Sequence, residues 1–76
     1  MGDIQYKKAK LKVAIIENDL KTTLDIAKEL GLSKRYICRL ANVNVGNVCS
    51  YLNGKLPMRD ENKTKIYNVI KEVLNV

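Results

Sequence analysis

The middle of this sequence carries positive charge without any negative charge. Residues 31–59 contain no Asp or Glu. Their cations are Lys34, Arg35, Arg39, Lys55 and Arg59. Ammonium and guanidinium groups bind phosphate oxygens, and the lack of carboxylates removes electrostatic repulsion from the same stretch. The pattern predicts contact with a polyanion.

The whole chain has a matching excess of cations. Its 76 residues include 14 Lys or Arg and 8 Asp or Glu, which gives a net charge of +6. A surplus of this size favours a polyanionic partner. The alternative interpretation is a solvated basic surface that only keeps the protein soluble.

The residue types give little reason to expect catalysis or metal binding. The sequence has no histidine, and its two cysteines, Cys38 and Cys49, are too few for a zinc site. It also lacks a glycine-rich phosphate loop and paired carboxylates beside a nucleophile. We expect no enzyme activity, no metal and no cofactor, with both thiols packed as small apolar groups in a reducing cytoplasm.

The length suits one compact domain without a deep substrate cleft. Residues 1–10 are polar and basic, and we expect a mobile N-terminal arm there, followed by a domain over residues 11–76. The lysines that cluster in and beside this arm are Lys7, Lys8, Lys10 and Lys12. No apolar run suits a signal peptide or a membrane span, which predicts a cytoplasmic protein without a membrane partner.

Apolar residues at steps of three and four predict an all-α fold. Thr22 followed by Asp25 resembles a capping box, which favours a helix over Thr22–Leu30. Gly31 is expected to end that helix in the left-handed conformation. Leu11–Asp19 is compatible with either a helix or a short strand, because its apolar residues also alternate.

Three more helices follow from their end signals. Ser33 is the expected cap of one helix, and Asn42 is expected to end it in the left-handed conformation. Asn44 is the expected cap of a helix over Val45–Leu52, and Asp60 that of the final helix. The residues expected to face the core are Val13, Ile16, Leu20, Leu24, Ala27, Leu30, Ile37, Cys38, Leu40, Ala41, Val48, Cys49, Leu52, Ile66, Val69, Ile70, Val73 and Leu74.

Short helices joined by tight turns are typical of a helix-turn-helix. This motif needs a small residue in its first helix, a turn residue that tolerates positive φ, an apolar plug and two apolar anchors in its second helix. Two overlapping registers meet these needs. The first consists of Ile26, Ala27, Leu30, Gly31, Leu32, Ile37 and Leu40. The second consists of Ile37, Cys38, Ala41, Asn42, Val43, Val48 and Tyr51.

The second register resembles a known group of families. Residues 31–55, GLSKRYICRLANVNVGNVCSYLNGK, are similar to the segment shared by Cro/lambda-type (XRE-like) repressors and lac-repressor-type headpieces. The following LPMRDENKTKIYNVIKEVL resembles the helix that closes those domains. The resemblance covers roughly residues 20–74. It implies a small lambda-repressor-like helical bundle whose recognition helix, Val45–Leu52, enters the major groove of DNA.

Recognition helices of those families usually begin with Gln, Arg or Tyr, and this chain departs from that pattern. Asn47 suits a bidentate pair with adenine, and Val45 suits a thymine methyl group. Gly46 is a poor helix residue that leaves room for the sugar-phosphate backbone. The candidate DNA-binding residues are Lys34, Arg35, Arg39, Asn44, Val45, Gly46, Asn47, Ser50 and Lys55.

The first register predicts an alternative fold, a winged helix-turn-helix. Residues 43–50 would then form a hairpin that turns at Gly46-Asn47, a recognised two-residue turn. The side chains facing the groove would be Lys34, Arg35, Tyr36 and Arg39. We favour the fully helical arrangement, because Asn44 suits a helix cap and the LNGK segment suits a helix end.

The residues and the resemblance together predict a sequence-specific DNA-binding transcriptional regulator, a small repressor of the phage or mobile-element type. We expect a homodimer on a short inverted repeat, paired through the C-terminal helix or through residues 4–17. We expect no small-molecule effector. The alternative is a protein-interaction module, such as an anti-repressor or adaptor, which the few polar residues in Val45–Ser50 favour.

Overall fold

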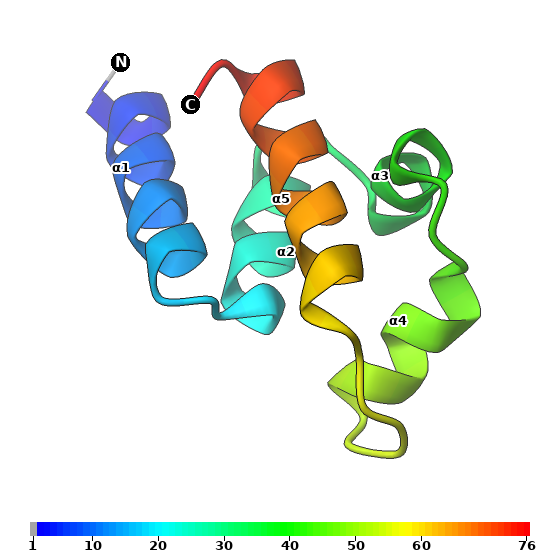
Figure 1. The fold of residues 1–76 in the computed structure, drawn as a ribbon. Helices are drawn as coiled ribbons and strands as arrows, with labels where there is room; N and C mark the ends of the chain where they lie inside the picture. The colour runs from blue at the N-terminus through cyan, green and yellow to red at the C-terminus, as the bar shows by residue number, and fades with distance from the viewer. Residues whose placement is uncertain (1) are drawn as a thin grey trace.

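The structure is a computed structural model that describes residues 2–76. Five α-helices and no β-strand are found in that range, which confirms the predicted all-α class. The helices are α1 (Gly2–Ile16), α2 (Leu20–Glu29), α3 (Lys34–Ala41), α4 (Val45–Leu52) and α5 (Asp60–Leu74) (Figure 1). The winged alternative is wrong, because residues 45–50 of its hairpin lie in α4 and no strand is found in residues 2–76.

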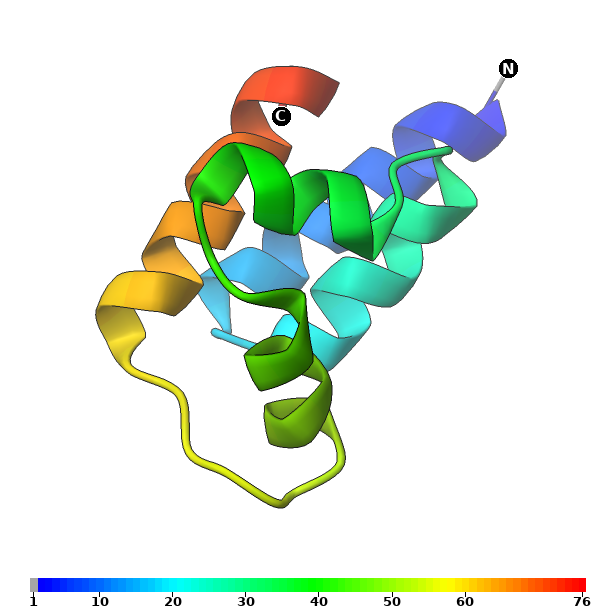
Figure 2. The ribbon, with the colours of Figure 1, turned by 90° about the vertical axis from the view of Figure 1, so that its right-hand side faces the viewer.

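The helices form a small bundle in which α2 and α5 lie between α1 and α3 (Figures 1 and 2). α1 packs along α2, whereas α3 packs against α2, α4 and α5. α1 and α4 lie on different sides of the molecule, and both ribbon views show them well separated (Figures 1 and 2). No helix among residues 2–76 is long and apolar enough to cross a membrane.

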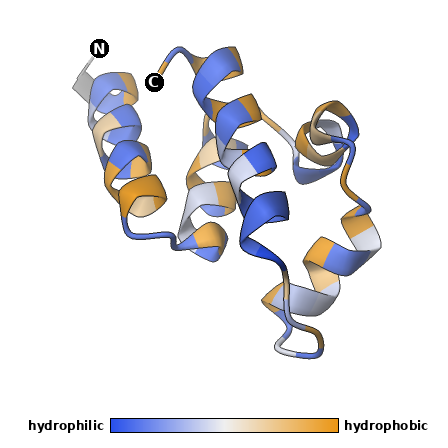
Figure 3. Cartoon of the chain, in the orientation of Figure 1, coloured by the Kyte–Doolittle hydropathy of each residue, from blue (hydrophilic) through white to orange (hydrophobic). Residues whose placement is uncertain are grey.

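Residues 2–10, which were predicted to form an N-terminal arm, are the first turns of α1, and Met1 lies outside the described residues. No proline or glycine interrupts residues 3–16, and the Lys, Ala, Gln and Leu residues there favour a helix. Asp3 lies in the first turn, where a negative charge stabilises the positive end of the helix dipole. Leu11 is fully buried, and a buried leucine contributes about 2 kcal/mol. Apolar and polar residues alternate in bands along α1 (Figure 3).

α2 begins two residues earlier than the sequence predicts. Asp19 caps it, and its carboxylate accepts from the Thr22 N–H at 3.2 Å and from the Thr22 hydroxyl at 2.8 Å. These hydrogen bonds lower the pKa of Asp19. The predicted capping box from Thr22 to Asp25 is wrong, because Asp19 is the cap and Thr22 already lies in the first turn of the helix. The earlier start also buries Leu20 in the core.

The ends of α3 and α4 follow the sequence signals. The Ser33 hydroxyl caps α3 by accepting from the Tyr36 N–H at 3.2 Å. Asn42 ends it at φ 58°, and Gly31, before it, lies at φ 91°. The predicted Val45–Leu52 helix is confirmed with both bounds. Asp60 is the first residue of α5 rather than its cap, so its carboxylate faces the helix dipole instead of a backbone N–H.

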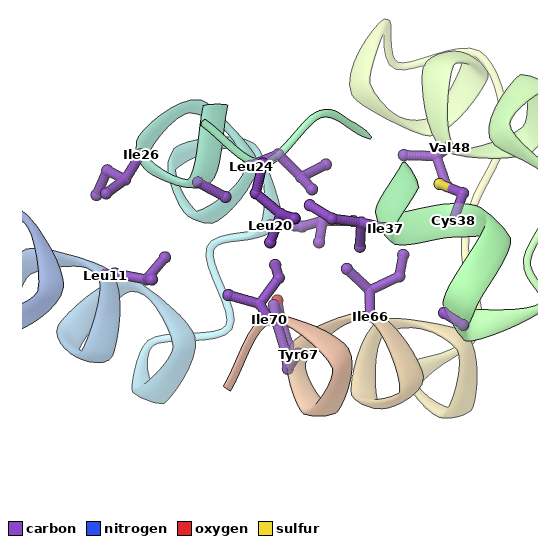
Figure 4. Packing of buried hydrophobic residues seen from close by; sticks show 13 residues of the cluster. Leu11, Leu20, Leu24, Ile26, Ile37, Cys38, Val48, Ile66, Tyr67 and Ile70 are labelled. Atoms are coloured by element: carbon purple, nitrogen blue, oxygen red, sulfur yellow. The ribbon is translucent and has the colours of Figure 1, made fainter. Parts of the chain in front are cut away.

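One apolar cluster holds the five helices together. Leu11 comes from α1, Leu24 from α2, Ile37 from α3 and Val48 from α4, and Ile66 and Ile70 extend the cluster along α5 (Figure 4). The buried apolar side chains are Leu11, Ala14, Leu20, Leu24, Ile26, Ala27, Leu32, Ile37, Cys38, Ala41, Val48, Ile66, Tyr67 and Ile70.

Four residues predicted to face the core are exposed instead. Val13 and Ile16 are 52% and 78% exposed, because α1 turns Leu11 and Ala14 toward α2 and these two away from it. Leu40 is 49% exposed on α3, where Cys38 takes the inward position. Val73 is 44% exposed near the end of α5, beyond the core residue Ile70. The partly buried members of the predicted core are Leu30, Cys49, Leu52, Val69 and Leu74.

Candidate nucleic-acid interface

A three-residue connection, Asn42–Asn44, fixes α4 relative to α3. Asn42 reverses the chain direction through its left-handed conformation, and the Val43 N–H donates to the Cys38 carbonyl at 2.9 Å. Val43 also packs against the apolar cluster. The connection therefore has its own hydrogen bond and its own apolar anchor, and it holds the two helices as one unit.

The first turn of α4 is organised by Asn44. Its side-chain oxygen accepts from the Gly46 N–H at 2.7 Å and more weakly from the Asn47 N–H at 3.4 Å. The oxygen of the Asn44 amide is thus committed to the cap. Its amino group makes no hydrogen bond within residues 2–76, and it is available as a donor to an outside acceptor.

α4 turns its inner face to α3 and its first turn to solvent. Val48 is fully buried and lies beside Cys38 of α3 (Figure 4). Gly46 and Asn47 are exposed, whereas Val45 and Ser50 are partly buried. Of the predicted base-reading side chains, Asn47 is thus the one fully open to a ligand.

The cations of α3 are divided between two surfaces. Arg35 and Arg39 are exposed and lie one helical turn apart on the same edge. Lys34 is half-buried and lines a different groove, together with Asp25 and Leu52. The sequence grouped all three cations, but the helical rotation separates Lys34 from the two arginines.

Lys55 extends the exposed surface beyond the end of α4. Its N–H donates to the Ser50 carbonyl at 2.8 Å, which holds the backbone of the turn while the side chain stays exposed. Ion pairs within residues 2–76 join Lys63 to Asp60 and Lys65 to Glu61. Neither of these ion pairs involves a cation of residues 31–59.

The loop before α5 adds a groove beside Asn47. Its lining includes Asn47, Pro57, Arg59 and Asn62. Arg59 is one of the cations already identified in the sequence, whereas no short-range motif connects Asn62 to α4. The groove brings two amides and one guanidinium to a single site, and these groups suit phosphate and base edges alike.

A cation–π contact secures this side of α4. The Lys63 ammonium lies 4.7 Å from the centre of the Tyr51 ring and 4.0 Å from an Asp60 carboxylate oxygen. The Lys63 side chain is only 13% exposed, so it ties α4 to α5 rather than serving a ligand. The contact contributes to a fixed spacing between α4 and the groove next to Asn47.

The remaining chemistry of the site is limited. Within residues 2–76 no three His, Cys, Asp or Glu side chains gather where they would hold a metal ion. The cysteines are free thiols, and burial raises the pKa of the Cys38 thiol. Comparisons of the chain with protein-family models, characterised proteins and solved structures gave no match.

Proposed function

We propose that α3 and α4 form a helix-turn-helix and that the protein binds double-stranded DNA, with α4 as the recognition helix. The observation that carries this proposal is the exposed first turn of α4, together with three exposed cations on the same carboxylate-free segment. Arg35 and Arg39 lie on α3 and Lys55 follows the end of α4, and none of them has a carboxylate partner within the described residues. An exposed helix N-terminus on a surface that also carries unpaired cations suits a DNA groove, because phosphates border that groove.

Each group has a distinct role in this proposal. Arg35 and Arg39 bind phosphates along one strand, and Lys55 binds the backbone on the far side of α4. Asn47 reads a base edge through its side-chain amide, with adenine as the matching base. The short, weakly polar reading surface predicts that phosphate contacts supply most of the affinity and that base discrimination is modest.

The biological role that follows is control of transcription by occupying DNA, as in a small repressor. A second candidate, a protein-interaction module, is favoured by one observation. Tyr36 and Leu40 are 45% and 49% exposed on α3 and lie one turn apart, so they offer an apolar contact next to the arginines.

A salt titration separates these two functions. Binding of the full chain to a short fluorescent duplex is measured by anisotropy over a range of salt concentrations. We expect the logarithm of affinity to fall linearly with the logarithm of salt, with a slope of about −0.9 per phosphate contacted. Arg35→Ala with Arg39→Ala should flatten the slope by roughly two such contacts.

The matched control removes two exposed lysines from α2, Lys21→Ala with Lys28→Ala, and changes the net charge equally. It should leave the slope near that of the wild type. Equal effects of the two variants would show that only net charge matters, which contradicts the proposed surface. A flat response of the wild type to salt would favour the protein-interaction module.

A further inference from the structure

α1 carries apolar residues on two opposite faces. One face, with Leu11 and Ala14, is buried against α2. The other face is open, and it includes Tyr6 at 64%, Val13 at 52% and Ile16 at 78% exposure. A helix that is apolar on more than one side is normally covered on each of them. The single chain covers only one side of α1.

The open face has the spacing of a helix–helix contact. Tyr6, Ala9, Val13 and Ile16 follow one another at steps of three, four and three residues, and all four are exposed. Such steps place side chains along one seam that fits a second helix with the same pattern. We call these four residues the α1 stripe. Ala9 near its centre leaves room for close approach of another backbone.

Grooves run along both sides of the α1 stripe. On one side Ala9 and Val13 border a groove shared with Thr22 and Ile26 of α2. On the other side Val13 and Ile16 border a groove closed by Val76 at the end of the chain. A ridge with a groove on each side allows the side chains of a second ridge to interlock with it.

The charges beside the α1 stripe indicate the partner. Lys12 flanks it on one side and Glu17 on the other, and both are exposed. In a parallel pair of α1 helices, Lys12 of one copy lies beside Glu17 of the partner subunit, and the reciprocal pair forms as well. An antiparallel pair would instead bring the two Lys12 side chains together. Lys10 also borders the stripe on the Glu17 side, with its ammonium 5.3 Å from the centre of the Tyr6 ring. The pair formed by Lys12 and Glu17 is therefore self-complementary in one orientation only.

We infer that the α1 stripe is a self-association surface, on which a second copy of this chain docks with its α1 parallel to the first. The contact is four side-chain layers long, so the dimer is weak in solution and depends on concentration. α4 lies on a different side of the molecule from α1, and the dimer leaves both copies of α4 uncovered (Figures 1 and 2). Two copies on one duplex would strengthen each other's binding through effective concentration.

The first test is sedimentation equilibrium of the full chain at increasing concentration, without DNA. We expect a monomer–dimer equilibrium that Val13→Glu weakens about tenfold or more, because two like charges would face each other across the seam. Leu40→Glu is the matched control, since it places the same charge at an equally exposed apolar position on α3. It should associate as the wild type does.

A second pair of variants tests the orientation. Lys12→Glu alone should weaken association, and adding Glu17→Lys should restore it, because the pair is re-formed with reversed charges. Ala9→Cys in a Cys49→Ser background should form an intersubunit disulfide with oxidised glutathione, since parallel helices place the two Ala9 positions face to face. Asp25→Cys, exposed on α2, should not cross-link.

Several outcomes would overturn the inference. These are a wild-type protein that stays monomeric at millimolar concentration, a Val13→Glu variant that associates normally, or a dimer that Leu40→Glu disrupts instead. Stripe-dependent binding to anionic lipid vesicles without self-association would assign the α1 stripe to a membrane surface. The inference is independent of DNA binding: a dimer that ignores DNA leaves it standing and refutes only the proposed function.

Discussion

The side-chain oxygen of Asn44 would lie 3.0 Å from a Cβ on Gly46. The same oxygen accepts a hydrogen bond from the Gly46 N–H at 2.7 Å, so residue 46 is drawn toward the cap. A side chain at position 46 would have to push the cap away. The Asn44 cap by itself therefore favours glycine at position 46, independently of any contact with DNA.

This relationship predicts coupling between positions 44 and 46. Alanine in an open helix position stabilises by about 1 kcal/mol relative to glycine. In the wild-type background we expect Gly46→Ala to give no such gain, because its methyl group crowds the Asn44 oxygen. In an Asn44→Ala background the same substitution should recover the full gain. Urea unfolding of the four proteins measures the coupling.

The crowding can be separated from a general intolerance of α4 to substitution. Ser50→Ala, at a partly buried position in the same helix, should have the same effect in both backgrounds. Additive effects of the substitutions at positions 44 and 46 would contradict the coupling.

Tyr67 links α5 to the connection between α1 and α2. Its hydroxyl donates to the side-chain oxygen of Asn18 at 2.7 Å, and the residue is only 7% exposed. We expect Tyr67→Phe to lower the free energy of unfolding at neutral pH by about 1 kcal/mol through loss of this hydrogen bond. Tyr36→Phe, at a more exposed position without such a partner in the described residues, should have little effect.

Tyr67 also predicts a loss of stability at alkaline pH. Burial, with smaller contributions from Tyr51, Asp19 and Asp60, raises the pKa of Tyr67 from 10.0 to about 12. The folded state therefore favours the neutral phenol. Its contribution is complete below pH 10 and is lost as the pH rises through about 12. The difference in unfolding free energy between wild type and Tyr67→Phe should shrink over this range, and a constant difference would contradict the assignment.

Asn47 and Arg39 should differ in their effects on DNA recognition. We expect Asn47→Ala to reduce discrimination between a selected site and random duplex by about 1–3 kcal/mol with an unchanged salt slope. Arg39→Ala should weaken binding to both duplexes alike and flatten the slope by about one contact. Competition binding at two salt concentrations measures both effects. Identical profiles for the two variants would contradict the division between base reading and phosphate binding.

The two cysteines should react at different rates. Cys38 is 2% exposed and its thiol pKa is raised by burial, whereas Cys49 is partly buried on α4. We expect alkylation of the native protein at neutral pH to label Cys49 first and Cys38 only on unfolding. Mass spectrometry of a Cys49→Ser variant provides the check, and rapid labelling of Cys38 there would show that the α3–α4 contact opens readily.

The sequence by itself determined the local structure of residues 31–52. Ser33, Asn42 and Asn44 end or begin helices through hydrogen bonds and backbone angles that involve only a few neighbouring residues. Such signals do not depend on the rest of the fold, which is why the bounds of α4 could be predicted. The basic, carboxylate-free character of residues 31–59 is also a property of the sequence alone.

The tertiary structure decided which faces and neighbours these helices have. The apolar residues of α1 fit either of two faces, and only packing on α2 selected Leu11 and left Ile16 exposed. In the same way, the rotation of α3 separated Lys34 from Arg39, and the packing of α5 brought Asn62 into the groove that Asn47 also lines. Helical periodicity predicts which residues lie on the same face of a helix. Which face is buried depends on the apolar surface of other helices, and residues far apart in the sequence supply it.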